Sequence, residues 1–386
     1  MSVELPIYMD HNATTPVDPR VFEAMRPYFT EIFGNAASRG HSFGWAAEAA
    51  VDKARQQVAA VLNARPDAIV WTSGATESNN LAIKGAAGAH TAKGRHIITQ
   101  VTEHKAVLDC CKKLEQQGYE ITWLGVDRLG RIDLDVLRDS IRRDTILVTI
   151  MWANNEIGTI QDISTIGAMC RERGVLFHTD ATQAVGKVPI DVVADNIDLL
   201  SMSGHKFYGP KGCGCLYVRN KPARVELTPV LDGGGHERGY RSGTINVPSA
   251  VGVGAACELA MNEMATEVPR LRKLRDRLER GIIEKVDGVC VNGDPASRLA
   301  HVTNVSFGGV GHDELLGSLY DIAVSTGSAC TSASLETSYV LRALGVPDKL
   351  AGSSLRMSLG KRNTEEEVNF VIDRLSTSIG RLRSLT

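Results

Sequence analysis

Between about residues 50 and 220, short apolar runs alternate with segments whose apolar residues recur at helical spacing. The runs predict strands over Ala68–Trp71, Ile97–Val101, Glu120–Val126, Thr145–Trp152, Val175–Thr179 and Ile197–Met202. The helical spacing predicts helices over Val51–Leu62, Asn80–Ala87, Lys105–Gln117, Leu134–Arg142 and Ser164–Arg173. Alternation of this kind is typical of βαβ units, so we expect an α/β fold with a mostly parallel sheet. An antiparallel addition is expected near residues 212–218.

The pattern changes after residue 258. Glu258–Ile283 is a long, charged, helical stretch that we interpret as a connector into a second domain. Beyond it, a short strand over Val302–Phe307 is mixed with helices over Glu314–Asp321 and Glu365–Ser376. We therefore expect a smaller α+β domain, with the boundary near residue 260.

Composition and charge exclude several classes of protein. The chain has 386 residues, of which 43% are hydrophobic and 23% charged, and a formal net charge of −2. These values argue against a disordered chain, and they give no global electrostatic reason to bind nucleic acid or a membrane. The apolar runs are too short to span a bilayer. Met1–Asp10 shows no basic region followed by an apolar stretch, so we expect a cytoplasmic protein.

The eight cysteines are too few for a disulfide scaffold, and the absence of a CxxC pair disfavours a zinc site. Cys110, Cys111, Cys170 and Cys257 fall in apolar, helical stretches and are interpreted as small core residues. Cys330 differs, because small polar residues surround it and predict a flexible loop with an exposed thiol. Taken alone, a tolerated surface cysteine is the simpler explanation for Cys330.

Candidate polar residues follow five of the six predicted strands, at the edge where parallel sheets bind ligands. They are the turn Thr72–Ser78, Glu103 with His104, residues 153–156, Asp180 with Gln183, and Ser203–Lys206. Each has a simpler explanation: the turn, His104 and Asp180 can act as helix caps, and Lys206 can be a solvated lysine. Together they place a carboxylate, a lysine, two histidines and a phosphate-type turn at one edge.

This set matches the needs of pyridoxal 5′-phosphate. The cofactor requires an amine that holds its aldehyde as a Schiff base, for which Lys206 is the candidate. It requires a carboxylate near its ring nitrogen, for which Asp180 is the candidate. The turn at Ser73–Ser78, with Ser203 and His205, is a candidate phosphate site, because a helix that begins after a Gly/Ser/Thr turn presents free N–H groups. His104 is the candidate for stacking on the ring.

Several motifs resemble those of the cysteine desulfurases. They are Thr72-Ser-Gly-Ala-Thr-Glu-Ser, Thr102-Glu-His-Lys, Ala153-Asn-Asn-Glu-Ile-Gly, His178-Thr-Asp-Ala-Thr-Gln, Ser203-Gly-His-Lys, Gly233-Gly-Gly-His-Glu-Arg-Gly, Arg241-Ser-Gly-Thr and Ser325-Thr-Gly-Ser-Ala-Cys-Thr-Ser. Their order and their extent, from about Ile7 to Leu385, are similar to the IscS/NifS type within the class-V aminotransferase-like family. The resemblance implies a fold type I transferase that depends on pyridoxal phosphate. It also implies a large domain with a mostly parallel seven-stranded sheet over residues 16–260 and a small domain over residues 1–15 and 261–386.

The resemblance also assigns roles to individual residues. Lys206 is implied to form the Schiff base, Asp180 to pair with the ring nitrogen, and Gln183 to bond the ring hydroxyl. His104 is implied to stack on the ring and to act in acid/base steps. The phosphate is implied to bind Ala75, Thr76, Ser203 and His205, with Thr244 reaching the phosphate of a neighbouring subunit in a homodimer. Asn155 is implied to lie near the ring oxygen and the substrate carboxylate, which Arg356 clamps.

The implied reaction converts L-cysteine to L-alanine and a persulfide on Cys330. Lys206 removes the α-proton, and the Cys330 thiolate attacks the sulphur of the substrate. The resemblance places Cys330 on a mobile loop at about 325–336. It also implies that Cys330 transiently binds an iron–sulphur cluster, and it implies no other metal ligand. The implied acceptors are an iron–sulphur scaffold protein and proteins of tRNA thiolation.

Three alternatives stay open. A selenocysteine lyase or a fold type I aminotransferase would keep the cofactor and change the reaction, and an interaction protein would have lost catalysis. The sequence departs from the family at Ala36 and Thr337, where proline is usual, and it stops at Thr386 without the C-terminal extension of longer members. These departures leave the scaffold partner open.

Overall fold

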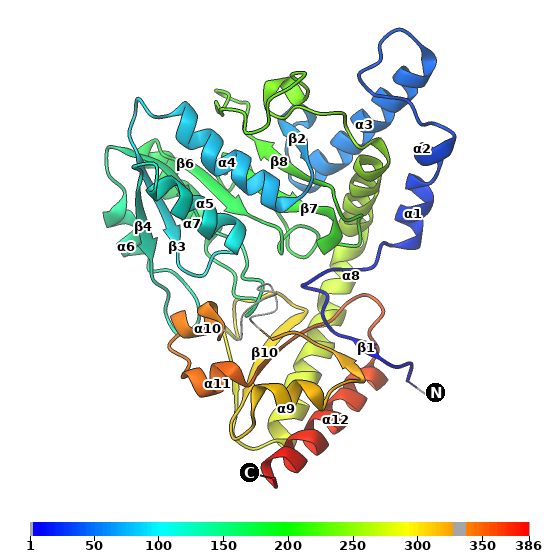
Figure 1. The fold of residues 1–386 in the computed structure, drawn as a ribbon, viewed down its shortest axis with the longest axis vertical. Coiled ribbons are helices and arrows are strands. Elements are labelled where there is room, and N and C mark those ends of the chain that lie inside the picture. The colour runs from blue at the N-terminus through cyan, green and yellow to red at the C-terminus, as the bar shows by residue number, and fades with distance from the viewer. Residues whose placement is uncertain (1–2, 327–336, 386) are drawn as a thin grey trace.

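The computed structural model describes residues 3–326 and 337–385. A seven-stranded sheet forms the upper part of the molecule in Figure 1, in the strand order β2-β8-β7-β6-β5-β3-β4. Its strands are β2 (Ile69–Thr72), β3 (His96–Gln100), β4 (Glu120–Leu124), β5 (Thr145–Thr149), β6 (Leu176–Asp180), β7 (Leu199–Ser203) and β8 (Gly214–Val218). Only β8 runs against the others, pairing antiparallel with β2 and β7. The carboxyl ends of the remaining six strands therefore meet at one edge.

Helices cover both faces of this sheet, and alternate strand residues point to opposite faces. On one face, α4 (Ala75–Ala89) and α5 (Lys105–Glu115) pack against strand residues such as Ile97 and Leu199. On the other face, α3 (Ser42–Val61), α6 (Leu134–Ser140) and α7 (Ile163–Arg173) pack against neighbours such as Ile98 and Leu200. Because both faces are covered, the strands other than β4 are almost wholly buried, and their residues do not alternate between a buried and an exposed face.

The lower part of the molecule holds a second hydrophobic core. It contains the antiparallel sheet β12-β10-β9 and the parallel pair β1-β11. The strands are β1 (Ile7–Tyr8), β9 (Val289–Val291), β10 (Val302–Phe307), β11 (Ile322–Ala323) and β12 (Ser354–Ser358). The helices here are α9 (His312–Gly317), α10 (Tyr339–Ala343), α11 (Asp348–Gly352) and α12 (Glu365–Arg383). α12 begins with a capping box formed by Thr364 and Glu367, which fixes its first turn.

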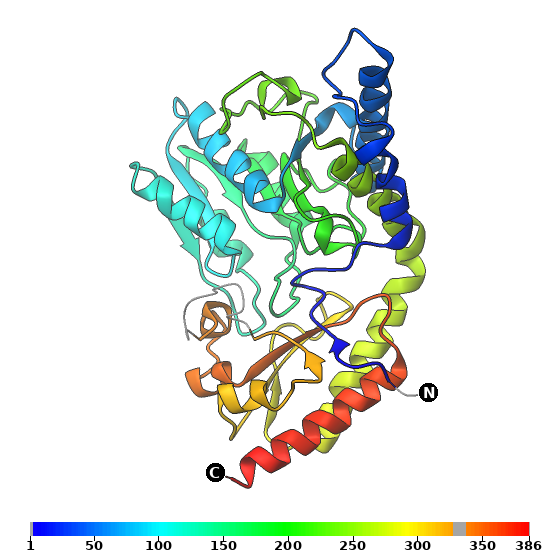
Figure 2. The same ribbon diagram turned by 45° about the vertical axis from the view of Figure 1, so that its right-hand side comes forward.

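One long helix joins the two parts. α8 (Val247–Lys285) runs along the side of the molecule, and α12 lies beside its lower half (Figure 2). Val253 and Cys257 of α8 belong to the upper core, whereas Leu278 and Ile282 belong to the lower one. The remaining helical segments are α1 (Pro19–Met25), α2 (Pro27–Thr30), η1 (Pro66–Ala68), η2 (Gly204–Lys206) and η3 (Glu237–Gly239). The predicted boundary near residue 260 falls inside α8, and the division into domains stays a prediction.

The predicted α/β fold with a seven-stranded, mostly parallel sheet and a smaller α+β part is confirmed. The antiparallel strand expected near residues 212–218 is β8. Several helices are longer than predicted. α3 begins at Ser42, α4 at Ala75 and α8 at Val247, because small residues at their starts give weak periodicity, and α12 continues to Arg383. Within the described part of the chain, no helix combines the length and the apolar character needed to cross a bilayer.

Candidate active site

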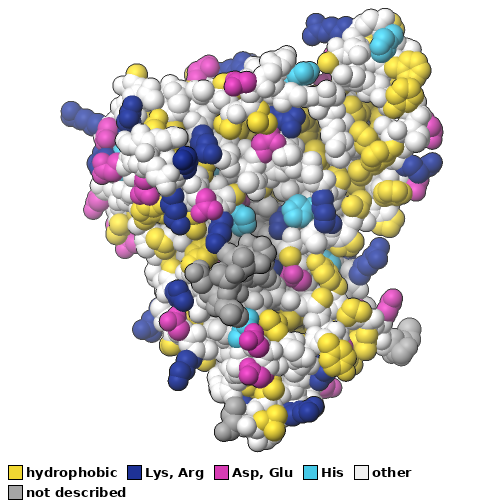
Figure 3. Space-filling model, in the orientation of Figure 1, with side chains coloured by type: hydrophobic (Ala, Val, Ile, Leu, Met, Phe, Trp, Pro, Cys, Tyr) yellow, Lys and Arg dark blue, Asp and Glu magenta, His cyan; other side chains and the backbone are white. Residues whose placement is uncertain are grey.

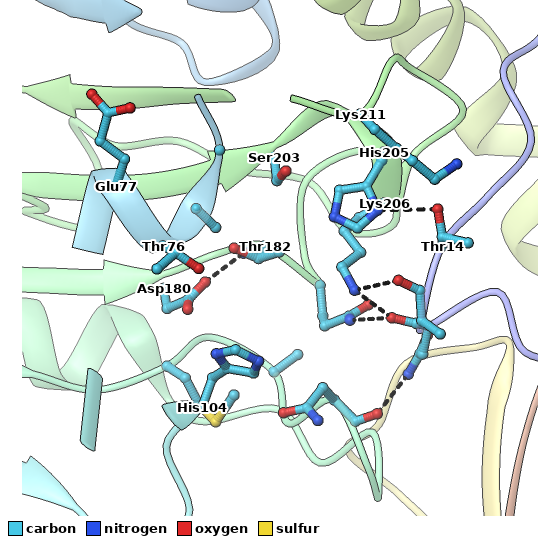
Figure 4. Close-up of a pocket in the computed structure, with 18 of the residues that line it drawn as sticks. Thr14, Thr76, Glu77, His104, Asp180, Thr182, Ser203, His205, Lys206 and Lys211 are labelled. Carbon is cyan, nitrogen blue, oxygen red and sulfur yellow. Dashed lines mark hydrogen bonds between the residues drawn. The ribbon is translucent and has the colours of Figure 1, made fainter. Parts of the chain in front are cut away.

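A cavity of about 570 Å³ opens at the carboxyl edge of the large sheet. Ten of the predicted site residues line it: Ala75, Thr76, His104, Asn155, Asp180, Gln183, Ser203, His205, Lys206 and Arg356. Nine of them come from the ends of sheet strands or the turns that follow, and Arg356 comes from β12 of the lower sheet. Figure 4 shows Asp180, His104 and Lys206 facing one space from different elements. The fold thus brings residues far apart in sequence into one cavity, although their individual roles stay predictions.

Asp180 ends β6, and its carboxylate accepts hydrogen bonds from two donors. Nδ2 of Asn79, on α4, lies 2.7 Å from Oδ2 of Asp180. The backbone N–H of Thr182 donates to Oδ1 at 3.0 Å. Asp180 is 5% exposed, so this negative charge is largely shielded from water while it faces the cavity. The carboxylate is therefore placed to pair with a positively charged ring nitrogen. Asn79 was not predicted, because nothing in the sequence links it to a residue a hundred positions away.

Lys206 lies in η2, directly after β7. Its Nζ donates to the backbone carbonyls of Asn12 at 2.7 Å and Ala13 at 2.8 Å. Asn12 is a junction of the site: its carbonyl also accepts from Nε2 of Gln183 at 3.0 Å, and its Nδ2 donates to the carbonyl of Asn155 at 3.0 Å. Sequence reasoning missed Asn12. The signal that could have found it is the polar run that directly follows the apolar pair Ile7–Tyr8, as at the other strand ends.

The predicted phosphate turn leads into α4, a helix of 15 residues. Gly74 has φ +147°, a conformation that residues with a Cβ rarely adopt, and a Cβ on Gly214 would lie 2.8 Å from Gly74 Cα. The close approach of these two glycines brings the turn against β8 and leaves the first N–H groups of α4 facing the cavity. Glu77 fixes the turn, because its carboxylate accepts from Ser73 N at 2.8 Å and from Arg241 Nε at 2.8 Å.

Basic groups surround the phosphate end of the cavity. Burial and, to a smaller extent, the charges of Lys206, Lys211 and Lys187 lower the pKa of His205 to about 4. His205 is therefore neutral at pH 7, and its Nδ1 lies 3.1 Å from the hydroxyl of Thr14. Lys211 also lines the cavity (Figure 4). A dianionic phosphate would complement this positive potential.

His104 caps α5. Its Nδ1 accepts a hydrogen bond from the backbone N–H of Ala106 at 3.1 Å, so a neutral ring carries its proton on Nε2. Burial lowers the pKa of His104, Asp180 raises it and Lys206 lowers it. The ring is therefore held in one orientation and one tautomer at the cavity wall, as an acid/base group requires.

Arg356, on β12 of the lower sheet, places its positively charged side chain in the cavity. Its Nη1 donates to the carbonyl of Asn155 at 3.1 Å, and its Nη2 lies 2.6 Å from Oδ1 of Asp10. Its Nε is buried and has no hydrogen-bond partner among the described residues, and the same is true of Asn155 Oδ1 and Thr182 Oγ1. Buried polar atoms are rarely left unsatisfied in proteins, so these three point to a polar ligand at this site.

Two predicted site residues are not brought into the cavity. Thr244 is exposed and lies outside it, as expected of a residue that serves a neighbouring subunit. Cys330, with most of the predicted mobile loop, lies outside the described residues. The chain enters and leaves that segment at fixed points: Ser325 pairs with Arg356 in a β-bridge, and Ser338 donates to Oε2 of Glu156 at 2.5 Å.

The donor set fits pyridoxal phosphate. An amine, a shielded carboxylate, a free helix N-terminus and three unsatisfied polar atoms share a cavity large enough for a cofactor and a small amino acid. Lys206, Asp180 and the turn at 73–76 would hold the aldehyde, the ring nitrogen and the phosphate respectively.

Comparison with known proteins agrees with this chemistry. The aminotransferase class-V family matches residues 7–371. The cysteine desulfurase IscS of Neisseria meningitidis serogroup C / serotype 2a is 57% identical over 386 residues, which cover all of this chain and 95% of the relative. Among solved structures, a NifS-like protein is 38% identical with a TM-score of 0.91, covering 98% of this chain and all of its own. A structure described as SspA in complex with cysteine is 39% identical with a TM-score of 0.81, covering 92% and 98% of the two chains.

The chain therefore belongs to the aminotransferase class-V family, whose members depend on pyridoxal phosphate. Within that family it belongs to the cysteine desulfurases of the IscS type, and neither a selenocysteine lyase nor an aminotransferase is favoured.

Proposed function

We propose that this chain moves the sulphur atom of L-cysteine onto Cys330 and releases L-alanine. The observation that carries the proposal is the convergence of Lys206, Asp180 and Arg356 on one cavity. When bound, pyridoxal phosphate supplies an aldehyde that condenses with an amine and a ring that withdraws electrons from the α-carbon of the substrate. The residues of the chain supply the remaining functions.

Arg356 binds and orients the substrate. A guanidinium group donates two parallel hydrogen bonds to a carboxylate, and the buried Nε of Arg356 is available for one of them. Asp180 stabilises a proton on the ring nitrogen. Lys206 accepts the α-proton, because its amine is set at the same cavity wall, and the neutral ring of His104 holds or passes protons at Nε2.

Cys330 receives the sulphur. Its thiolate attacks the γ-sulphur of cysteine, so that a sulphur–sulphur bond forms and the carbon–sulphur bond breaks. The electron pair of the broken bond stays with the β-carbon, which takes up a proton and becomes the methyl group of alanine. The persulfide left on Cys330 is then passed to an acceptor protein, which we propose to be an iron–sulphur scaffold or a protein of tRNA thiolation in the cytoplasm.

We propose a homodimer as the working unit, acting without direct contact to nucleic acid or membrane. Five large aromatic side chains, each at least half exposed, gather on α1, α2, α3 and the segment between them: Phe22, Phe29, Phe33, Phe43 and Trp45. Figure 3 shows this apolar surface at the upper right of the molecule. So large a patch favours a protein partner, and the exposed Thr244 is available to a second copy. Light scattering of the holoenzyme tests this, because a monomeric mass would contradict it.

The experiment that tests the proposed reaction is incubation with L-cysteine and no keto acid, followed by measurement of alanine and of the mass of the Cys330 peptide. We expect alanine, and one added sulphur atom on that peptide. C330S should release no alanine, whereas C290S, which removes the exposed cysteine of β9, should keep full activity. Alanine release by C330S, or a requirement for a keto acid, would contradict the proposal.

A further inference from the structure

A partly buried lysine lies next to the active-site cavity, in a part of the molecule that the proposed reaction does not use. Lys187 stands four residues after Gln183, on the turns that follow β6. It lines a smaller cavity of about 50 Å³, the inner cavity, which shares Lys206 with the active-site cavity. No salt bridge to Lys187 is formed in the described part of the chain.

The main contact of Lys187 is with a predicted cofactor ligand. Its Nζ donates to Oε1 of Gln183 at 2.9 Å. A lysine ammonium carries donors only, so the ammonium form of Lys187 holds Oε1 of Gln183 as the acceptor on this side. The amide nitrogen of Gln183 then faces the other way, where it donates one of its two N–H groups to the carbonyl of Asn12 at 3.0 Å. Gln183 also lines the active-site cavity, so its second N–H group is available to a ligand there.

Lys187 has little other electrostatic support. Burial and, to a smaller extent, the charges of Lys206 and Arg356 lower its pKa to about 7. The titratable or charged side chains that line the inner cavity with it are His11, Lys206, Tyr208, Glu263, Glu267, His301 and Lys361. The two glutamates are engaged elsewhere: Glu263 accepts from Lys361 at 2.6 Å, and Glu267 accepts from Arg270 at 2.9 Å. Lys187 donates to Gln183 in either protonation state, because both the ammonium and the amine have N–H groups.

We propose that Lys187 is a positioning residue of the cofactor site, which fixes the amide of Gln183 with its nitrogen towards the oxygen of the cofactor ring. The carbonyl of Asn12 accepts from the amide nitrogen on one side, and Lys187 holds the amide oxygen on the other. With Oε1 held by Lys187, the amide cannot turn its oxygen towards the negatively charged ring oxygen. The inference rests on the proposed role of Gln183 and adds the residue that determines its orientation.

The test is the absorbance of the holoenzyme as a function of pH, without substrate. A donor to the ring oxygen stabilises the unprotonated Schiff base, so removal of that donor raises the pH midpoint of the absorbance change. We expect K187M to raise the midpoint by about one pH unit, that is, about tenfold in the proton equilibrium. K187R, which keeps an N–H donor, should stay close to the wild type. Cofactor content and thermal unfolding, measured for each variant, identify any variant that fails to fold.

Q183A separates this inference from the proposed function. If Lys187 acts through Gln183, Q183A raises the midpoint and K187M adds nothing in the Q183A background. An unchanged midpoint in K187M, or a K187M shift that persists undiminished in the Q183A background, overturns the role of Lys187. An unchanged midpoint in Q183A itself would instead refute the proposed contact of Gln183 with the ring. Alanine release by the wild type, measured separately, tests the reaction independently of both.

Discussion

The buried Arg356 forms an ion pair with the partly buried Asp10, in which Nη2 of the guanidinium lies 2.6 Å from Oδ1 of the carboxylate. The two residues are 346 positions apart and meet because residue 10 bridges to Ser358 at the edge of β12. The pair uses one end of the guanidinium, and Nη1 binds the carbonyl of Asn155, so the orientation of Arg356 is set before substrate arrives. With the proposed role of Arg356, a substrate carboxylate would meet an ordered partner and would lose little affinity to its ordering.

R356K is therefore expected to weaken the binding of L-cysteine. A lysine keeps the charge but cannot hold Asp10, Asn155 and a carboxylate together in one plane. We expect KM for cysteine to rise roughly 10- to 100-fold, as for the loss of a charged hydrogen bond. Steady-state alanine release measures it. R374K, which alters the pairing with Asp321 away from the cavity, is the control. A KM that is unchanged in R356K would show that the carboxylate binds elsewhere.

H104Q is expected to slow the proton transfers while leaving substrate binding intact. Glutamine keeps the approximate length of the side chain but has no titratable nitrogen. We expect kcat to fall about 10²- to 10⁴-fold. The absorbance change of the cofactor on addition of cysteine should still occur in rapid-scan measurements. Loss of that change in a correctly folded, cofactor-loaded variant would mean that His104 serves binding instead.

N79A is expected to weaken the hold of the protein on its cofactor. Asn79 provides one of the two donors to Asp180, and without it a buried carboxylate oxygen is left unsatisfied. We expect the dissociation constant of pyridoxal phosphate to rise about tenfold, in line with the cost of such an atom. Titration of the apoenzyme, followed by absorbance, measures it. N369A, whose side chain contacts Arg277 far from the cavity, should bind as the wild type does.

Glu156 gives the fold a dependence on pH. Burial raises the pKa of this carboxyl group and outweighs the hydrogen bond from Ser338 and the charge of Arg356, which lower it, so that the pKa rises from 4.5 to about 7. Between these two pH values the folded protein binds the proton more tightly than the unfolded chain. The free energy of unfolding should therefore fall as the pH rises from 4.5 to 7, by about 3 kcal/mol in total.

E156Q removes this titration, because a glutamine stays neutral and still accepts from Ser338. The variant should gain stability relative to the wild type as the pH rises through this range, and the difference should level off above it. Urea unfolding at several pH values measures the change. A constant difference between the two proteins at every pH would show that Glu156 does not retain its proton in the folded state.

The upper part of the fold could be predicted because its strands and helices alternate and polar residues follow the strands. Asp180, His104 and Lys206 were found in this way, each at the end of an apolar run. β12 was missed because Ser354–Ser358 alternates small polar with apolar residues, which gives no continuous apolar run. Arg356 was therefore named from resemblance alone, and its place in the cavity depends on pairing between distant segments.

The residues that hold the site side chains in place also depend on contacts between segments, so they could not be predicted either. Hydrogen bonds join Asn79 to Asp180, 101 positions away, and Asn12 to Lys206, 194 positions away. Lys187 bonds Gln183 across the turn after β6. Such contacts depend on the packed structure rather than on local periodicity. The chemistry of a site can therefore be inferred from strand ends, whereas the groups that orient its side chains require coordinates.

The most direct measurement is to reduce the holoenzyme with borohydride and identify the peptide that carries the cofactor. Three lysines lie in or next to the active site: Lys206 and Lys211 line the cavity, and Lys187 lines the inner cavity beside it. The account predicts that the pyridoxyl group is found on Lys206, and that K206A carries none. A pyridoxyl group on Lys187 or Lys211 of the wild type, or its presence in K206A, would contradict it.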